Sequence, residues 1–236
     1  MSSRLPEGAL ICVDFDDTLV ENQRHFEDAV CDLCRLLEEA TGTPAAAASA
    51  AVQRLEARTH GHGRHRNRFL LTVLGAYGEV AGSGSVPLRL LPALAAIAAA
   101  PYDALPSPAP GAEAALRRLR AAHRGPLWLV TTGDPVIQAG RVQRSGLSGS
   151  FDAIHVLPEK DAAAFAALGA GHDSPWMIGN SPVTDILPAL QAGFQAVHVR
   201  AATWWLDVAA VPADVPAYPD FAAAVEGLLA GGAETP

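Results

Sequence analysis

Short apolar runs that alternate with helical patterns, from residue 111 to residue 200, constrain the fold of this chain more than any other feature. The expected strands occupy 10–13, 127–131, 151–157, 176–179 and 196–200. The expected helices occupy 111–123, 135–145, 161–168 and 184–192. Strand–helix–strand units are right-handed, and their strands run parallel. The alternation therefore predicts an α/β fold, a Rossmann-like parallel sheet with helices on both faces.

The stretch from residue 19 to residue 108 has a different pattern. Helical periods begin near residues 27, 43, 68 and 88, and no strand is expected between 20 and 125. The proline-rich segment 101–111 is expected to be a connection without regular structure. The sequence thus predicts an α/β core domain of residues 1–18 and 109–236. A smaller all-helical domain, residues 19–108, is inserted after the first strand.

Polar residues follow the expected strands at their carboxyl ends, where parallel sheets bind ligands. The first strand ends in three carboxylates within four positions, Asp14, Asp16 and Asp17, followed by Thr18. The other strands are followed by Thr131, Thr132, Gly133 and Asp134, by Lys160, and by Asn180, Ser181 and Asp185. We therefore expect these side chains to meet at one edge of the sheet.

The chemistry of this set indicates a phosphate site beside a cation. Clustered carboxylates repel one another unless a cation joins them, and one or two carboxylates among oxygen ligands suit Mg²⁺. Thr131 and the backbone amides of Thr132 and Gly133, ahead of a helix, offer donors to an anion. Lys160 adds a positive charge. An aspartate beside such a site can attack phosphorus.

Composition excludes several classes of protein. The net charge of −8 argues against a general nucleic-acid binder. No apolar run is long enough to span a bilayer, and the first residues lack the apolar region of a signal peptide. Three cysteines suit a reducing compartment better than a disulfide framework. We expect a soluble cytoplasmic protein with no membrane or nucleic-acid partner.

Four motifs in this order make the sequence resemble the haloacid dehalogenase superfamily, in particular its phosphatases with a helical cap between the first and second motifs. The first motif, Asp-x-Asp-x-Thr after an apolar strand, is Asp14 to Thr18. The second is Thr131 in LWLVTTGD, and the third is Lys160. The fourth is GNSPVTD, residues 179–185. The resemblance covers the whole predicted core.

The resemblance implies a role for each matching position. Asp14 would be the nucleophile that forms an aspartyl-phosphate, and Asp16 would be the general acid and base. Lys160 would pair with Asp14 and the phosphate. Thr131 would hold phosphate oxygens together with the backbone of Thr132 and Gly133.

The implied cofactor is Mg²⁺, held by the Asp14 carboxylate, the Asp16 carbonyl, Asn180 and Asp185. The implied substrate is a small phosphorylated metabolite, and the implied activity is similar to that of a phosphoglycolate phosphatase.

One position departs from the family pattern: Asn180 stands where an aspartate is usual. Its amide oxygen can still bind a metal but brings no charge, so weaker Mg²⁺ affinity is expected. Dehalogenases of the superfamily also tolerate Asn near this place, but they resemble Asp-x-Tyr at the first motif. Because this chain keeps Asp16, phosphatase is favoured over dehalogenase.

Two other functions stay open. A phosphoglucomutase-type enzyme would return the phosphoryl group to an isomerised product. A non-catalytic phosphate-ligand sensor would explain Asn180 as a mark of lost activity. A phosphonate hydrolase of this family would need a lysine in the cap, and residues 19–108 contain none.

Four further features have simpler explanations. Asp134 before Pro135 is expected to cap a helix. The pair Cys31 and Cys34 is expected to pack on a helix, because no second pair at zinc spacing accompanies it. The segment 58–68, with four Arg and three His, is expected to be a solvated loop or a contact for an anionic substrate. A transition-metal site is less favoured, because the spacing of the three His fits no ligand pattern. Trp204 and Trp205 are expected to cover a flank of the sheet.

Overall fold

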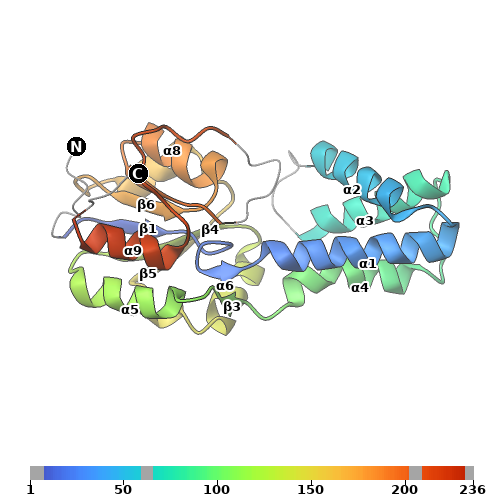
Figure 1. Cartoon of the computed structure of the whole chain (residues 1–236), viewed down its shortest axis with the longest axis horizontal. Helices are drawn as coiled ribbons and strands as arrows, with labels where there is room; N and C mark the ends of the chain where they lie inside the picture. Colours follow the sequence, from blue (N-terminus) through green and yellow to red (C-terminus); the bar gives the residue numbers. More distant parts are fainter. Residues whose placement is uncertain (1–7, 60–65, 202–208, 232–236) are drawn as a thin grey trace. The chain divides into compact units, whose positions relative to one another are not determined.

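The computed structural model describes residues 8–59, 66–201 and 209–231 and consists of two compact units (Figure 1). The core unit comprises Met1–Glu21 and Leu105–Pro236, and the helical unit comprises Asn22–Ala104. The helical unit thus begins three residues later and ends four residues earlier than the helical domain expected from the sequence, residues 19–108. A short strand pair at the junction accounts for the difference.

The core unit is built on one parallel sheet with the strand order β5-β4-β1-β6-β7-β8. The strands are β1 (Ile11–Val13), β4 (Leu127–Thr132), β5 (Ala153–Leu157), β6 (Trp176–Gly179), β7 (Gln195–Val199) and β8 (Ala217–Tyr218). β1 is central, because Ile11 pairs with Leu127 on one side and with Trp176 on the other. The predicted α/β fold is confirmed, and the first carboxylates follow its central strand.

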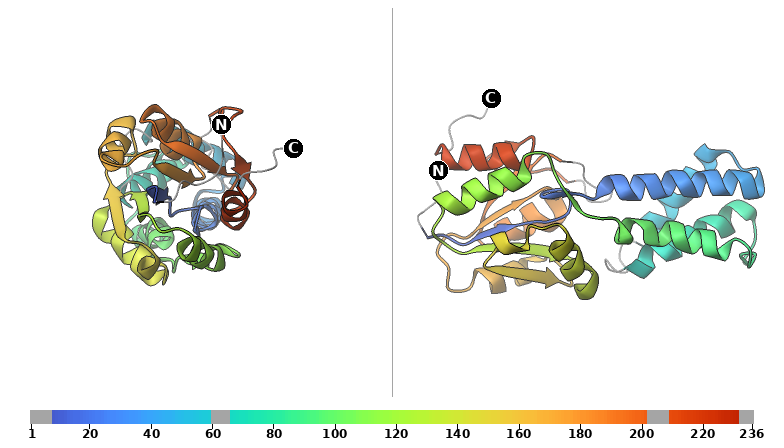
Figure 2. Two further views of the ribbon diagram at one scale, coloured as in Figure 1. Left: turned by 90° about the vertical axis from the view of Figure 1, so that its left-hand side faces the viewer. Right: turned by 90° about the horizontal axis from the view of Figure 1, so that it is seen from below.

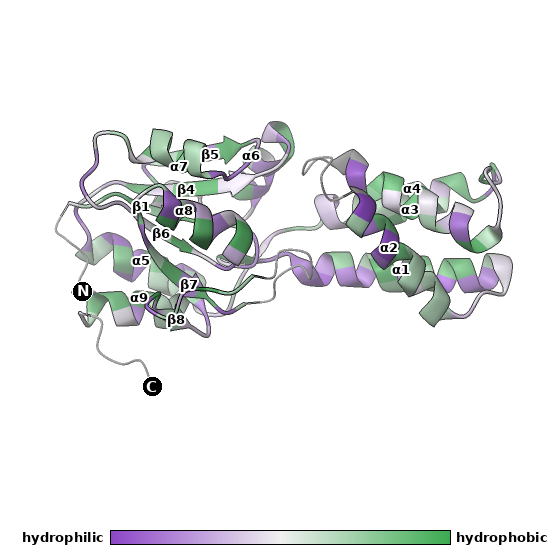
Figure 3. Ribbon diagram, turned by 90° about the horizontal axis from the view of Figure 1, so that it is seen from above, coloured by the Kyte–Doolittle hydropathy of each residue, from purple (hydrophilic) through white to green (hydrophobic). Residues whose placement is uncertain are grey.

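Helices cover both faces of the sheet, as predicted. One face packs against α5 (Ala112–Ala122) and α9 (Phe221–Leu229), which lie side by side (Figure 2). The other packs against α7 (Ala162–Gly169) and α8 (Leu187–Gln191). Side chains of β1 alternate between the two cores: Ile11 and Val13 face the first, and Cys12 faces the second. The central strands are accordingly apolar (Figure 3).

The helical unit consists, in its described part, of α1 (Gln23–Thr41), α2 (Ala45–Thr59), α3 (Arg66–Ala81) and α4 (Leu91–Asp103). An apolar core joins the four helices, and in it Phe26 makes edge-to-face contacts with Phe69 and Tyr102, with ring centroids 5.2 and 5.6 Å apart. None of the described helices is long and apolar enough to cross a membrane.

Two expectations about the connection between the units are wrong. Val20–Glu21 (β2) and Ser107–Pro108 (β3) form a two-residue antiparallel pair, although no strand was expected from 20 to 125. Segment 101–111 also contains the end of α4, which continues through Pro101 to Asp103. A pair this short has no periodicity in the sequence. β8 and α9 were not predicted either.

Parts of the chain singled out in the sequence lie outside the described residues, namely 60–65 and Trp204–Trp205. At the ends of the Arg-rich segment, Arg58 is exposed. Arg68 lies 3.2 Å from the buried Glu56, which also accepts a hydrogen bond from Thr72 at 2.6 Å. Arg68 therefore serves the packing of the helical unit. Of the cysteine pair, Cys34 is buried and Cys31 is exposed.

Candidate active site

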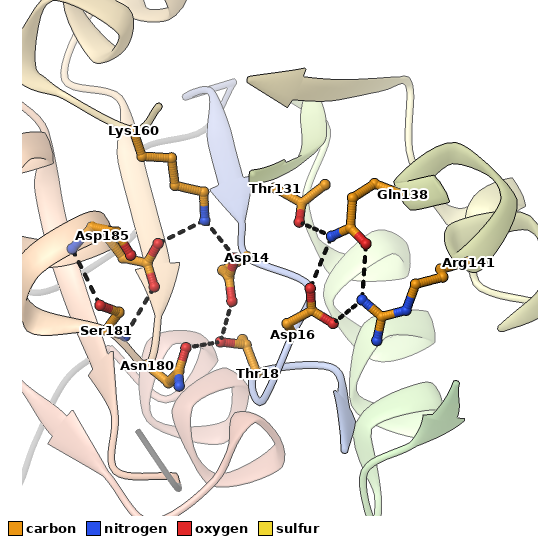
Figure 4. A network of polar contacts seen from close by, with 11 residues as sticks. Asp14, Asp16, Thr18, Thr131, Gln138, Arg141, Lys160, Asn180, Ser181 and Asp185 are labelled. Carbon is orange, nitrogen blue, oxygen red and sulfur yellow. Dashed lines mark hydrogen bonds and ion pairs between the residues drawn. The ribbon is translucent and has the colours of Figure 1, made fainter. Parts of the chain in front are cut away.

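The polar residues predicted at the strand ends lie together in the core unit (Figure 4). The hydrogen bonds and ion pairs form two neighbouring sets. One joins residues that follow β1, β5 and β6, and the other joins Asp16 and Thr131, on the loop after β1 and on β4, to residues on the helix α6 (Pro135–Arg144). The labelled residues are Asp14, Asp16, Thr18, Thr131, Gln138, Arg141, Lys160, Asn180, Ser181 and Asp185.

The loop after β1 turns sharply and so presents its acids to the sheet edge. The Asp14 N–H still donates to the Ile178 carbonyl at 2.9 Å, which continues the ladder to β6. Phe15 is fully buried. Asp17 has φ of 60°, a left-handed conformation that Asp tolerates better than most residues, and its N–H donates to the Val20 carbonyl at 2.7 Å. The turn keeps Asp14 and Asp16 fixed to the strand end.

Lys160 joins two carboxylates at the centre of the site. Its Nζ donates to Asp14 Oδ1 at 2.5 Å and to Asp185 Oδ1 at 2.7 Å. All three side chains are buried, and Lys160 is the only lysine in the sequence. Burial opposes the charge of Lys160, but Asp14 and Asp185 outweigh it and raise the pKa of the ammonium. A charged Lys160 therefore holds the two acids together.

The ionisation of Asp14 is finely balanced. The pKa of Asp14 is raised to about 7: burial contributes most, Asp185 and Asp16 add to it, and Lys160 opposes them. One buried ammonium thus only partly offsets the desolvation of this carboxylate and the charge of its neighbours. A second cation beside Asp14 would favour the ionised form that a nucleophile requires.

The turn after β6 positions Asp185. An added Cβ on Gly179 would lie 2.5 Å from Asp185 Oδ2, so the close approach of this carboxylate requires glycine. Pro182–Ile186 form one turn of π-helix, in which the Ile186 N–H donates to the Ser181 carbonyl at 3.2 Å. Asp185 Oδ2 accepts from the Ser181 N–H at 2.9 Å. Such π-turns are frequent at functional sites.

Asn180 faces Asp14 across the hydroxyl of Thr18. The Thr18 Oγ1 lies 3.0 Å from Asp14 Oδ2 and 3.3 Å from Asn180 Oδ1, so these two oxygens converge on one point. The backbone carbonyl of Asn180 accepts a hydrogen bond from His198 Nε2 at 3.1 Å, which holds the loop after β6 in place. Asn180 is buried, so its amide oxygen is fixed beside the carboxylate.

The oxygen atoms of this corner fit Mg²⁺ but not a softer metal. Within the described ranges, no group of three or more His, Cys, Asp or Glu side chains is placed to hold a metal ion. A cation here would rely on Asp14, Asp185, the amide oxygen of Asn180, backbone and water. Mg²⁺ commonly binds through one or two carboxylates and keeps several waters.

Asp16 points away from Lys160 toward α6 (Figure 4). Asp16 Oδ2 accepts from Gln138 Nε2 at 2.8 Å, and Asp16 Oδ1 lies 2.7 Å from Arg141 Nη1 in an ion pair that lacks the angle of a hydrogen bond. Sequence analysis did not identify Gln138 or Arg141. The available signal was a pair of polar residues one turn apart on the helix that follows Thr131.

The predicted phosphate-binding residues differ in their surroundings. Thr131 is buried, and its Oγ1 accepts from Gln138 Nε2 at 2.8 Å. Thr132 ends β4 in register with Leu157. The Gly133 N–H donates to the Leu157 carbonyl at 3.4 Å, a long hydrogen bond. The hydroxyl of Thr131 is therefore better placed than the Gly133 amide to meet an anion.

Asp134 caps α6, as predicted. Its Oδ1 accepts from the backbone N–H groups of Val136 and Ile137 at 2.9 and 3.1 Å, and Pro135 occupies the first helical position.

We expect Asp134→Ala to lower the free energy of unfolding of the core by about 1 kcal/mol, because two amides lose their partner. Asp134→Asn retains a capping oxygen and is expected to match the wild type. Urea unfolding followed by tryptophan fluorescence measures both, and equal losses would contradict the capping role.

The sequence of residues 9–193 matches the family model of the haloacid dehalogenase-like hydrolases. The chain therefore belongs to this family. The match covers the whole helical unit, which lies between the first and second motifs, and the core unit from residue 9 to residue 193. The sequence has no match among curated proteins.

Solved structures of the family share the fold of the chain. A haloacid dehalogenase-like family hydrolase from Xanthomonas campestris is 22% identical with a TM-score of 0.75, over 96% of this chain and 98% of that one. A predicted phosphoglycolate phosphatase from Haemophilus somnus is 17% identical with a TM-score of 0.66, over 94% and 98%. An L-2-haloacid dehalogenase from Xanthobacter autotrophicus is 17% identical with a TM-score of 0.60, over 94% and 98%.

These similarities establish the fold but do not establish the reaction. The similar structures carry the names of a phosphatase and of a dehalogenase, so a shared fold does not decide between them. The choice depends on the side chains around Asp14.

Proposed function

We propose that this hydrolase is a Mg²⁺-dependent phosphatase that cleaves a small phosphomonoester through an aspartyl-phosphate intermediate. The observation that carries the proposal is the position of Asp16. A second carboxyl lies in the loop that begins with Asp14, and Gln138 links it to the hydroxyl of Thr131. Phosphoester cleavage needs a group to protonate the leaving oxygen, whereas halide leaves without a proton.

The first step transfers the phosphoryl group to the protein. A carboxylate oxygen of Asp14 attacks phosphorus, and the bond between phosphorus and the ester oxygen breaks with its electron pair. The Asp16 carboxyl gives its proton to that oxygen, so the alcohol leaves neutral. Lys160 offsets negative charge on the transferring group, and the Thr131 hydroxyl donates to one of its oxygens.

The second step restores the protein. The Asp16 carboxylate now takes a proton from a water whose oxygen attacks phosphorus, and the bond between phosphorus and Asp14 breaks. Inorganic phosphate leaves, Asp14 regains its carboxylate and Asp16 its proton. Mg²⁺, held by Asp14, the Asp16 carbonyl, Asn180 and Asp185, would supply charge neutralisation on the phosphate in both steps.

Removal of the metal tests the proposal. We expect phosphate release from 4-nitrophenyl phosphate in excess Mg²⁺ to fall at least about 100-fold in EDTA and to return when Mg²⁺ is restored. Mg²⁺ is also expected to raise the midpoint of thermal unfolding, because it binds only the folded site. Equal release with and without metal would overturn the metal dependence.

The same samples separate the rival functions. Chloride release from 2-chloropropionate, unaffected by EDTA, would indicate a dehalogenase. Conversion of a sugar phosphate to its isomer without free phosphate would indicate a mutase. Binding of inorganic phosphate without turnover of any phosphomonoester in a metabolite panel would indicate a sensor and would identify Asn180 as the mark of lost activity.

A further inference from the structure

Gln138 occupies a position that the sequence motifs of the family do not include. It lies four residues after the cap Asp134, and its N–H donates to the Asp134 carbonyl at 2.9 Å. The residue is 4% exposed, so its amide group forms its hydrogen bonds within the site. An amide buried this deeply is costly unless its polar atoms are paired.

The orientation of the Gln138 amide is fixed by its partners. Its oxygen Oε1 accepts from Arg141 Nη1 at 2.8 Å, and a guanidinium can only donate. Its nitrogen Nε2 therefore faces the other way, with two N–H groups. One donates to Asp16 Oδ2 and the other to Thr131 Oγ1, each at 2.8 Å. Both donors of one side chain are thus used on two residues of the site.

The bond to Thr131 determines what its hydroxyl can do. A threonine hydroxyl has one proton to donate and accepts through its lone pairs. Because Gln138 donates to Thr131 Oγ1, the proton of Thr131 is directed elsewhere. An unprotonated phosphate oxygen can only accept, so the arrangement orients Thr131 as a donor before any ligand binds.

The bond to Asp16 determines where its carboxyl lies. Gln138 holds Oδ2, and Arg141, stacked over the Phe15 ring at 5.7 Å, lies beside Oδ1. Asp16 is still 23% exposed on its side chain, so it stays open to substrate and water. The two residues of α6 thus define one position of the carboxyl.

We propose that Gln138 is a positioning residue that couples the phosphate-binding hydroxyl of Thr131 to the acid–base carboxyl of Asp16. This inference rests on the proposed phosphatase function. It assigns to α6 the task of setting the distance and direction between the group that binds phosphate and the group that protonates the leaving oxygen.

The test compares substrates that differ in their need for a proton. The 4-nitrophenolate group leaves 4-nitrophenyl phosphate readily as an anion, whereas the alkoxide of 2-phosphoglycolate needs a proton from Asp16. The ratio kcat/KM reports steps through the first phosphoryl transfer, so the second role of Asp16 does not obscure it. We expect Gln138→Met to lower kcat/KM about 10-fold for the aryl ester and about 100-fold for the alkyl ester, within the range of acid catalysis.

Two further variants make the result specific. Gln138→Glu keeps the size and the acceptor for Arg141 but removes both N–H donors, so it is expected to show the same difference between substrates. Gln143→Met changes an exposed glutamine on the same helix and is expected to stay within about twofold of the wild type for both substrates. Thermal unfolding of all variants identifies any that are not folded. Inhibition by inorganic phosphate is expected to weaken about fivefold in both Gln138 variants, because Thr131 loses its fixed orientation.

Equal losses on both esters in folded Gln138 variants, with unchanged phosphate inhibition, would overturn the positioning role. Failure of the wild type to release phosphate from either ester would overturn the proposed function itself, and this inference with it. The two failures are distinct, because the first requires an active wild type.

Discussion

Asp14→Asn is expected to lower kcat for phosphomonoester hydrolysis by at least about 10⁴-fold, because an amide oxygen cannot form the aspartyl-phosphate. The change preserves size, so the contacts with Thr18 and the ladder bond to β6 can persist. Phosphate release from 4-nitrophenyl phosphate measures the loss. Acid quenching of the wild type during turnover, followed by mass spectrometry, is expected to find phosphate on the peptide that contains Asp14.

Asp17→Asn is the matched control for this prediction. It makes the same chemical change three residues away, at a position whose left-handed φ of 60° suits Asn. We expect activity within about threefold of the wild type. A tenth or more of the wild-type rate in Asp14→Asn would exclude Asp14 as the nucleophile, and equal losses in both variants would point to damage of the turn.

Lys160→Met is expected to have the second largest effect, because it disables the site and destabilises the core. The change leaves Asp14 and Asp185 buried together without the ammonium that both contact. Removing one partner of a buried ion pair typically costs about 3–5 kcal/mol. The positive charge of Lys160 lowers the pKa of Asp14, so its loss favours the protonated carboxyl. A protonated carboxyl is not a nucleophile. We expect kcat to fall at least about 10³-fold.

Tryptophan fluorescence measures the stability change selectively, because the sequence of the helical unit, Asn22–Ala104, contains no tryptophan, while Trp128 and Trp176 lie on strands of the core sheet. Urea unfolding is best done in EDTA, since Mg²⁺ could partly replace the missing charge. Lys160→Arg keeps the charge but not the compact shape, and its loss of stability is expected to be smaller. A Lys160→Met protein as stable as the wild type would show that the two carboxylates do not need this cation.

The rule that parallel strands present their carboxyl ends at one edge predicted much of the site from the sequence. Lys160 lies 146 residues after Asp14 and 25 residues before Asp185 in the sequence. The apolar runs that predict the strands nevertheless placed all three residues at the same edge of the sheet. Their roles in catalysis stay predictions. The direction of Asp16 was not predictable, because no pattern shows toward which neighbour a carboxyl turns.

Other elements were missed for different physical reasons. Gln138 and Arg141 belong to none of the four sequence motifs. Only the packing of α6 shows which face of this helix lies against the edge of the sheet. β2 and β3 are too short for any period. For α9 a signal was present: Asp220 precedes the run FAAAVEGLL, and its Oδ1 accepts from the Ala223 N–H at 2.8 Å. That capping pattern is sufficient to predict the helix.

The burial of the only lysine turns ordinary protein chemistry into a probe of the site. Reagents that modify lysine side chains usually label many surface amines, but here the single lysine, Lys160, is 4% exposed and bound to two carboxylates. Its labelling rate therefore reports how often the site opens and the ammonium releases its partners. Nitrogen-15 labelling of lysine likewise gives one side-chain resonance, so binding of phosphate or Mg²⁺ can be followed at a single atom without assignment.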